Sequence, residues 1–216
     1  MVNKIDQNSL INPKRFLTNF YEKMASYPKG PNAFLKARDN EKDLEIWAVS
    51  IILIGLNKIT NKPWWIQKPK PKDDPPDAFS VSYKIEKESN LIEYVPIEVV
   101  FVPEYIRQQS WDSLLSDEQN IYNFLNDKKF NFKSYEQGTH LVVYFNIKLD
   151  KFDLAKLSNL ISEKNPKFAE IWFILSTDPI AENMLIEKTF PERLQITIRL
   201  EDCLLKDIDT ITKQST

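Results

Sequence analysis

Two acidic residues, Asp77 and Glu98, have the surroundings in this sequence that point most clearly to chemistry. Asp77 follows a Pro-Pro pair at the start of a β-rich segment, and Glu98 lies inside the apolar run IEVVFV. Burying a carboxylate is costly unless it is paired or binds a cation. Carboxylate oxygens are the ligands that Mg²⁺ prefers, so an acid at a turn and an acid on a buried strand could share a metal ion.

Both acids also have structural interpretations, which the pattern leaves open. An Asp after Pro-Pro is common in turns. An acid within an apolar strand can be solvated at a sheet edge, or can form one half of a structural ion pair.

The composition excludes several other kinds of site. Lys and Arg number 29 against 31 Asp and Glu, which gives a formal net charge of −2 and no general attraction for nucleic acid. Cys203 and His140 are the only residues of their types, which excludes a disulfide framework and Cys- or His-rich metal sites. Three glycines in the whole chain exclude a Gly-rich phosphate-binding loop.

The N-terminal residues and the longest apolar run indicate where the protein works. MVNKIDQNSL has neither the basic nor the apolar region of a signal peptide. Ile46 to Leu56 is apolar but far shorter than the roughly 20 residues needed to span a bilayer. With a single cysteine, these features predict a cytoplasmic protein without a membrane contact.

The elements that must position the two acids begin with two helices. The pattern predicts a docking helix from Asn12-Pro13 to just before Pro28, then a loop over Pro28–Asn32 and a short segment around Phe34. A second helix from about Asp39 to Ile59 is apolar around most of its circumference, as expected of a helix buried against a sheet.

A hairpin should carry the acids. The residues after Trp64-Trp65 form a Pro/Lys loop or an edge, residues 79–84 alternate as a half-buried strand, KESN turns the chain, and residues 91–102 return as a second strand. Pro96 suggests a bulge or an edge. The apolar residues after it are typical of a strand covered on both faces.

The rest of the chain predicts helices that alternate with strands. One or two helices over residues 110–130, with a possible cap at Ser116, precede a strand at 140–149, a helix at 153–163 and a strand at 170–176. The last two strands should be parallel. A polar loop over 178–192 leads to a final strand, so we expect an N-terminal helical elaboration (1–38), a mixed-sheet α/β core domain (39–205) and a polar tail (206–216).

This element order, together with Pro76-Asp77 and Glu98, resembles the PD-(D/E)XK nuclease superfamily, the restriction-endonuclease-like fold. The resemblance covers residues 39–176. It implies Mg²⁺-dependent hydrolysis of phosphodiester bonds, with Asp77 and Glu98 as metal ligands and Glu41 or Glu45 on the buried helix as the helical acid. Glu45 is the candidate for a third ligand, and its structural alternatives are a solvated acid on the helix face or a partner of Lys42.

One residue departs from the family pattern. The family carries a lysine two positions after the strand acid, and this sequence has Val100 there. Lys84, on the other strand of the hairpin, could supply the missing ammonium if the register brings it to Glu98. Either a relocated lysine completes the site, or the domain keeps the fold and has lost the chemistry.

Two functions from different classes follow. The first is a metal-dependent nuclease, and the second is a non-catalytic protein-interaction module on a nuclease-like fold. Trp64 and Trp65 beside Lys68, Lys70 and Lys72 could contact DNA or another nucleic acid, although one core tryptophan among solvated lysines explains them as well. We assign no role to His140, and Cys203 is expected to be a small buried residue of the last strand.

Overall fold

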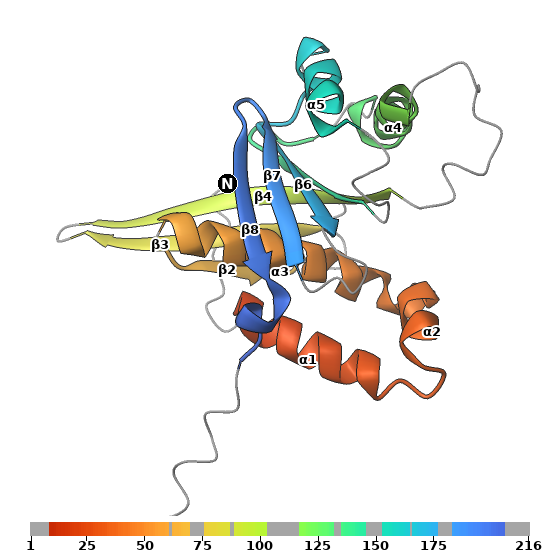
Figure 1. Ribbon diagram of the computed structural model, residues 1–216. Coiled ribbons are helices and arrows are strands. Elements are labelled where there is room, and N and C mark those ends of the chain that lie inside the picture. The colour runs from red at the N-terminus through yellow and green to blue at the C-terminus, as the bar shows by residue number, and fades with distance from the viewer. Residues whose placement is uncertain are drawn as a thin grey trace, which may run out of the picture.

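A single eight-stranded sheet with helices on both faces organises the chain (Figure 1). The structure is a computed structural model that describes residues 9–60, 62–69, 76–86, 89–102, 117–131, 135–145, 153–164, 166–176 and 183–205. The expected α/β architecture with a mixed sheet flanked by helices is confirmed. None of the helices described is long and apolar enough to cross a membrane.

The strands lie in the sheet in the same order as in the chain. They are β1 Leu10–Ile11, β2 Trp64–Gln67, β3 Ala78–Glu86, β4 Ser89–Val102, β5 His140–Phe145, β6 Glu170–Ser176, β7 Asn183–Phe190 and β8 Leu194–Arg199. β4, β5 and β6 are parallel to one another, and every other neighbouring pair is antiparallel. The predicted parallel pair of β5 and β6 is therefore confirmed.

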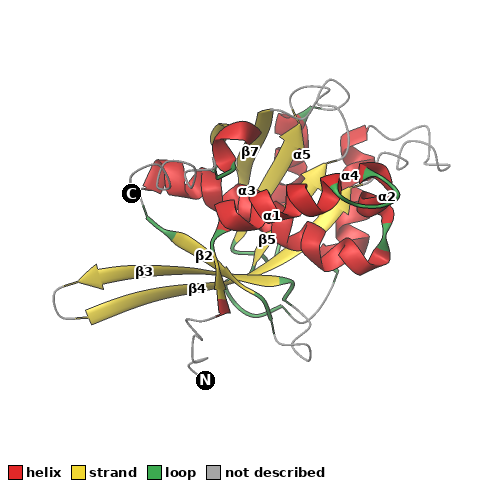
Figure 2. Ribbon diagram, turned by 90° about the horizontal axis from the view of Figure 1, so that it is seen from below, coloured by secondary structure: helices red, strands yellow, loops and turns green. Residues whose placement is uncertain are grey.

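The helices lie on both faces of the sheet. The α-helices are α1 Pro13–Ala25, α2 Pro31–Lys36, α3 Glu41–Thr60, α4 Asp117–Leu125 and α5 Leu154–Glu163. Shorter turns are the 3-10 turns η2 Arg38–Asn40 and η6 Leu200–Cys203 and the π-helical turn η4 Asn126–Phe130. α1 and α3 pack on one face of the sheet, whereas α4 and α5 cover the other (Figures 1 and 2).

α3 is the centre of the first layer. Every residue from Glu45 to Gly55 is buried, because the helix lies between the sheet and α1. Asn12 begins α1 as predicted, since its side chain accepts a hydrogen bond of 3.1 Å from the Arg15 amide. Leu17 of α1 and Phe34 of α2 belong to the same core cluster as α3, so the N-terminal helices share the core of the sheet.

β4 joins the two layers because its successive side chains point to opposite faces. Val99 packs in the core of α3, and Val100 and Val102 pack in the core of α4 and α5. The expectation that this strand is covered on both faces is confirmed. Pro96 lies where β4 pairs with β3 alone, because pairing with β5 begins at Ile97.

Three sequence-based expectations were wrong. The part of β3 whose side chains are described, residues 78–82, is not half-buried, since Ser80 and Ser82 are buried along with the apolar residues beside them. The loop predicted over Pro28–Asn32 ends earlier, because Pro31 begins a short helix, α2, that includes Phe34. The supposed polar loop over 178–192 contains β7, a strand with a buried glutamate, Glu187, at its centre.

Cys203 and the C-terminal tail were the subject of two smaller expectations. Cys203 is buried, as expected, but it lies in η6 because β8 ends at Arg199. Ser116 and the tail at 206–216 lie outside the described residues.

Gly55 marks a close approach of α3 to β7, and it leads to a test of the packing. A Cβ atom at this position would lie 2.6 Å from Ile186 Cδ1, which is buried. Ile186→Val removes that carbon. In the Ile186→Val background, Gly55→Ala should stabilise by about 0.5–1 kcal/mol, because alanine favours the helix.

In the wild-type background, Gly55→Ala should change the free energy of unfolding less favourably than it does in the Ile186→Val background, by at least about 1 kcal/mol. The reason is that the extra methyl group overpacks the core. Urea unfolding of the four proteins of this double-mutant cycle measures the difference. Equal effects of Gly55→Ala in both backgrounds would contradict the packing.

Candidate functional site

Asp77 lies at the point where β3 begins and the neighbouring edge of β4 becomes free. Its amide donates a 3.0 Å hydrogen bond to the Ile97 carbonyl, and its Oδ2 accepts one of 2.9 Å from the Val99 amide. The carboxylate therefore satisfies a β4 amide that has no β3 partner, since β3 starts at Ala78. Only 7% of Asp77 is exposed.

Lys129 brings Asp77 and Glu98 together. Its Nζ lies 2.6 Å from Glu98 Oε2 and 3.6 Å from Asp77 Oδ2. The separation of these two oxygens cannot exceed the sum of the two distances, so the carboxylates are neighbours. Glu98 points to the face covered by α4, as do Val100 and Val102.

Lys42 joins the third candidate acid to the same site from the opposite face. Its Nζ lies 3.0 Å from Glu45 Oε2 and 3.1 Å from Asp77 Oδ1. Lys42 and Glu45 both belong to the first half of α3. Glu45, Lys42, Asp77, Lys129 and Glu98 thus alternate in charge across the sheet, and we call these five residues the acid–lysine cluster.

The turn η4 explains how Lys129, thirty-one positions after Glu98 in the chain, reaches the Glu98 carboxylate. α4 is amphipathic, and Ile121 and Leu125 anchor it to the sheet. The helix then widens into a π-helical turn, a feature that often occurs at functional sites. Lys129 lies on this turn with 16% of its side chain exposed, whereas the adjacent Lys128 is exposed.

Burial and an excess of negative charge alter the acidity of the cluster. Burial, followed by the charge of Asp77, raises the pKa of Glu45 from 4.5 to about 7, although Lys42 opposes the change. Burial opposes protonation of Lys42, but its contacts with Glu45 and Asp77 raise its pKa overall. With all three carboxylates ionised and both lysines charged, the site has a surplus of one negative charge, and protonation of Glu45 near pH 7 removes it.

Tyr135 adds a hydroxyl group beside the cluster. Burial, followed by the charges of Glu98 and Asp77, raises its pKa, so it stays protonated at neutral pH. Its ring packs against Phe168, with the centroids 4.7 Å apart. Neither Tyr135 nor Lys129 was identified from the sequence, because each lies more than thirty residues after Glu98 in a segment without a motif.

Lys84 is far from the cluster. The register of the hairpin places it opposite Leu91, whereas Ala78 at the start of β3 is opposite Ile97. Glu98 lies seven positions after Leu91 on β4, which is about 23 Å at roughly 3.3 Å per residue. The backbone therefore does not bring Lys84 to Glu98, and Lys129 lies where an ammonium group was expected.

The other residues considered above make structural contacts. His140 Nδ1 lies 3.3 Å from Glu170 Oε2, and burial lowers the pKa of the imidazole. Lys62 lies over the ring of Trp64, and Lys68 approaches Asp43 and the ring of Phe16. Trp65 is half-buried, and Lys70 and Lys72 fall outside the described residues.

The oxygen ligands of the cluster suit Mg²⁺ better than a soft metal. Mg²⁺ is commonly held by one or two carboxylates, with water and substrate phosphate completing its shell. Asp77 and Glu98 are two neighbouring carboxylates that both contact Lys129. Within the described ranges, no three His, Cys, Asp or Glu side chains form a group that could hold a metal ion. Glu45 is therefore near this pair through Asp77 and Lys42, and does not form a three-acid group with it.

Comparisons with known proteins found no relative of this chain, so its function is argued from the geometry of the acid–lysine cluster. No protein-family model, curated protein or solved structure matches the chain.

The raised pKa of Glu45 predicts how stability depends on pH. Folded Glu45 holds its proton up to about pH 7, whereas unfolded Glu45 releases it near 4.5. The resulting stabilisation is fully present below the lower value and is lost as pH rises through the higher one. In EDTA, the stability of Glu45→Gln relative to wild type should rise by about 1–3 kcal/mol across this window.

Urea unfolding at a series of pH values measures this change. Wild-type and Glu45→Gln profiles that stay parallel throughout would contradict the assignment.

Proposed function

We propose that this protein is a metal-dependent nuclease, in which Asp77 and Glu98 hold Mg²⁺ and Lys129 replaces the lysine missing at position 100. The observation that carries the proposal is the contact of one partly buried ammonium group with both carboxylates. The same three groups, two acids and a lysine, make up the site that the resemblance to the PD-(D/E)XK superfamily implies.

The order of the elements supports this proposal. α3, β2, β3, β4, α4 and β5 follow one another as helix, three-stranded meander, helix and strand. Asp77 precedes the second strand of this meander and Glu98 lies on the third. Lys129 comes from the end of the second helix, so it can reach the same point as a side chain at position 100.

Each residue has a defined part in the proposed reaction. When bound, Mg²⁺ would polarise the phosphodiester and lower the pKa of a bound water. Water adds to phosphorus while the bond from phosphorus to the leaving oxygen breaks, and a proton from the water ends on that oxygen. Lys129 orients the attacking water and offsets the negative charge that develops, and Tyr135 supplies a further hydroxyl near Glu98.

The internal pairing of the cluster favours a second function. Lys42 and Lys129 already compensate most of the negative charge of the three acids. A domain that kept the fold and used these ion pairs only for stability would be a non-catalytic interaction module. It would bind a protein partner and would cleave nothing.

A cleavage assay separates the two functions. Labelled single- and double-stranded DNA and RNA are incubated with the protein and Mg²⁺, Mn²⁺ or EDTA. The nuclease proposal expects metal-dependent cleavage that Glu98→Gln abolishes. The matched control is Glu93→Gln, because Glu93 lies on the same strand but is exposed and pairs with Lys62.

Cleavage that is equal in wild type and Glu98→Gln would contradict the site. No cleavage by wild type with any substrate would favour the interaction module.

A further inference from the structure

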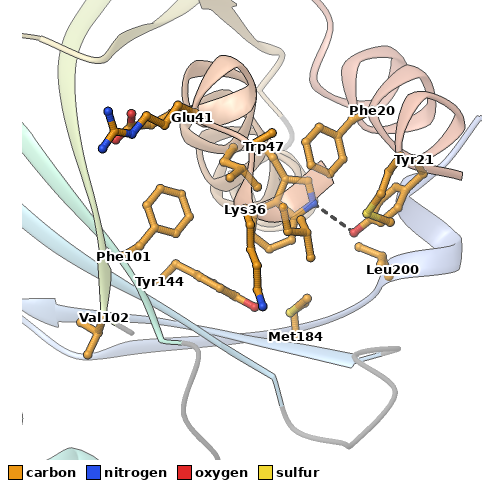
Figure 3. Close-up of a pocket in the computed structure, with 15 residues that line it drawn as sticks. Phe20, Tyr21, Lys36, Glu41, Trp47, Phe101, Val102, Tyr144, Met184 and Leu200 are labelled. Carbon is orange, nitrogen blue, oxygen red and sulfur yellow. Dashed lines mark hydrogen bonds between the residues drawn. The ribbon is translucent and has the colours of Figure 1, made fainter. Parts of the chain in front are cut away.

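A cavity of about 670 Å³ opens on the face of the sheet that carries α1 and α3 (Figure 3). It lies between α1, α2 and α3 on one side and the ends of β4 and β5 on the other. Its volume falls within the range of sites that bind small molecules. The proposed nuclease site does not account for this cavity.

The walls of the cavity are largely aromatic. Its aromatic lining residues are Phe20, Tyr21, Trp47, Phe101 and Tyr144. Tyr144 is packed edge-to-face against Trp47 and Phe101, with ring centroids 5.1 and 5.8 Å away. Figure 3 shows the rings of these residues gathered around the space, with Lys36 extending along it. Such walls suit a flat ligand with a π-face.

The polar groups of the cavity suit a ligand that also carries negative charge. Lys36 and Arg38 contribute two cations to the lining. The Tyr21 hydroxyl accepts a 3.0 Å hydrogen bond from Trp47 Nε1, which leaves its own proton able to bond to a ligand. Lys36 and Arg38 are exposed, so they can reach an anionic group at the mouth of the cavity, and together they outweigh the one carboxylate of the lining, Glu41.

Two residues connect the cavity to the cluster. Glu41 lines the cavity one helical turn before Glu45, and its charge contributes to the raised pKa of Glu45. Phe101 lies on β4 three residues after Glu98. The side chains of Phe101 and Glu98 point to opposite faces of β4, so the cavity adjoins the part of the cluster formed by Lys42 and Glu45 on α3. A nucleic-acid strand that ran from Asp77 past the first turn of α3 would bring a nucleotide to the aromatic walls.

We propose that this cavity binds an unpaired nucleobase of a single-stranded nucleic acid, with Lys36 and Arg38 holding the adjacent phosphate. The inference rests on the proposed nuclease function, and it names the substrate as single-stranded or locally unpaired. Stacking on Phe101 and Tyr144 provides affinity without strong sequence preference, because every base has a π-face. A base-paired duplex would have to unpair before binding.

Fluorescence anisotropy of a labelled single-stranded oligonucleotide, measured with Ca²⁺ in place of Mg²⁺, tests binding separately from cleavage. Phe101→Ala should weaken binding about tenfold, and Phe101→Tyr should retain it. Lys36→Glu changes an exposed residue, so this variant should fold. It therefore keeps the test decisive if Phe101→Ala fails to fold. It should also weaken binding and reduce its dependence on salt. A strand of abasic residues should bind wild type as weakly as the intact strand binds Phe101→Ala.

The outcomes separate this inference from the proposed function. Wild-type affinity in both Phe101→Ala and Lys36→Glu, or no binding of the strand by wild type, overturns the nucleobase site, whether or not metal-dependent cleavage is observed. Base-dependent binding that both variants lose, without any cleavage, keeps the site and overturns the nuclease.

Discussion

Lys129→Met is expected to lower metal-dependent cleavage by about 10²–10³-fold, the cost typical of removing one preorganised group that stabilises transition-state charge. Lys129 is the one cation among the described residues that contacts both Asp77 and Glu98, and only 16% of its side chain is exposed. Methionine keeps most of the length and apolar volume of the side chain. The loss therefore reports the ammonium group. Single-turnover cleavage at saturating Mg²⁺ measures the rate.

The adjacent lysine provides the control for this experiment. Lys128→Met makes the same chemical change one residue earlier on η4, but Lys128 is exposed and is not part of the acid–lysine cluster. It should cleave at the wild-type rate. If both variants lose activity equally, the effect comes from net charge or from η4 as a whole, and Lys129 has no special part.

Arg193→Met should destabilise the protein by about 2–3 kcal/mol, the largest effect on stability expected from a charged residue outside the cluster. Glu187 on β7 is fully buried. Arg193 donates to its Oε1 from Nε at 3.0 Å and from Nη2 at 2.8 Å. Removing the guanidinium leaves a buried carboxylate with Gln195 as its remaining hydrogen-bond donor among the contacts described. The cost stays below that of a fully buried pair, because Arg193 is half-exposed.

Arg199→Met is the matched control, because the ion pair of Arg199 with Glu201 is long, at 3.8 Å, and both side chains are exposed. Its unfolding free energy should stay within about 0.5 kcal/mol of wild type. Denaturant unfolding of the three proteins gives the comparison. Equal destabilisation by the two substitutions would show that the burial of Glu187 does not decide the effect.

The acids of the cluster could be predicted from the sequence because each stands out from its neighbours. Asp77 follows Pro-Pro, Glu98 interrupts an apolar strand, and Glu45 precedes the apolar part of α3. The structure brings Asp77 and Glu98 to one ammonium group, as their shared position on a hairpin suggested. Their use in binding a metal stays a prediction.

The lysine could not be predicted, for a physical reason. Lys129 approaches Glu98 from the helical layer that covers the same face of β4 but lies some thirty residues later in the chain, and its direction depends on a π-helical turn that has no simple sequence signal. Lys84 was proposed because it lies on the same hairpin, but the register of β3 and β4 moves it away from Glu98.

β7 was missed for a related reason. Glu187 and Lys188 at its centre resemble loop residues, and only the tertiary contact with Arg193 shows why a buried strand can hold that glutamate. Patterns of local polarity therefore predicted the apolar strands well. They failed where a charged partner outside the strand, here Arg193 in the turn that follows β7, makes burial of a polar residue possible.

The claim that Asp77 and Glu98 form a divalent-cation site is tested most directly by titrating Mn²⁺ and measuring the free ion by electron paramagnetic resonance. Wild type should bind Mn²⁺ in competition with Mg²⁺, and Asp77→Asn should bind it at least about tenfold more weakly, because one of two carboxylate ligands is lost. Equal binding by the two proteins, or none by wild type, would contradict the claim.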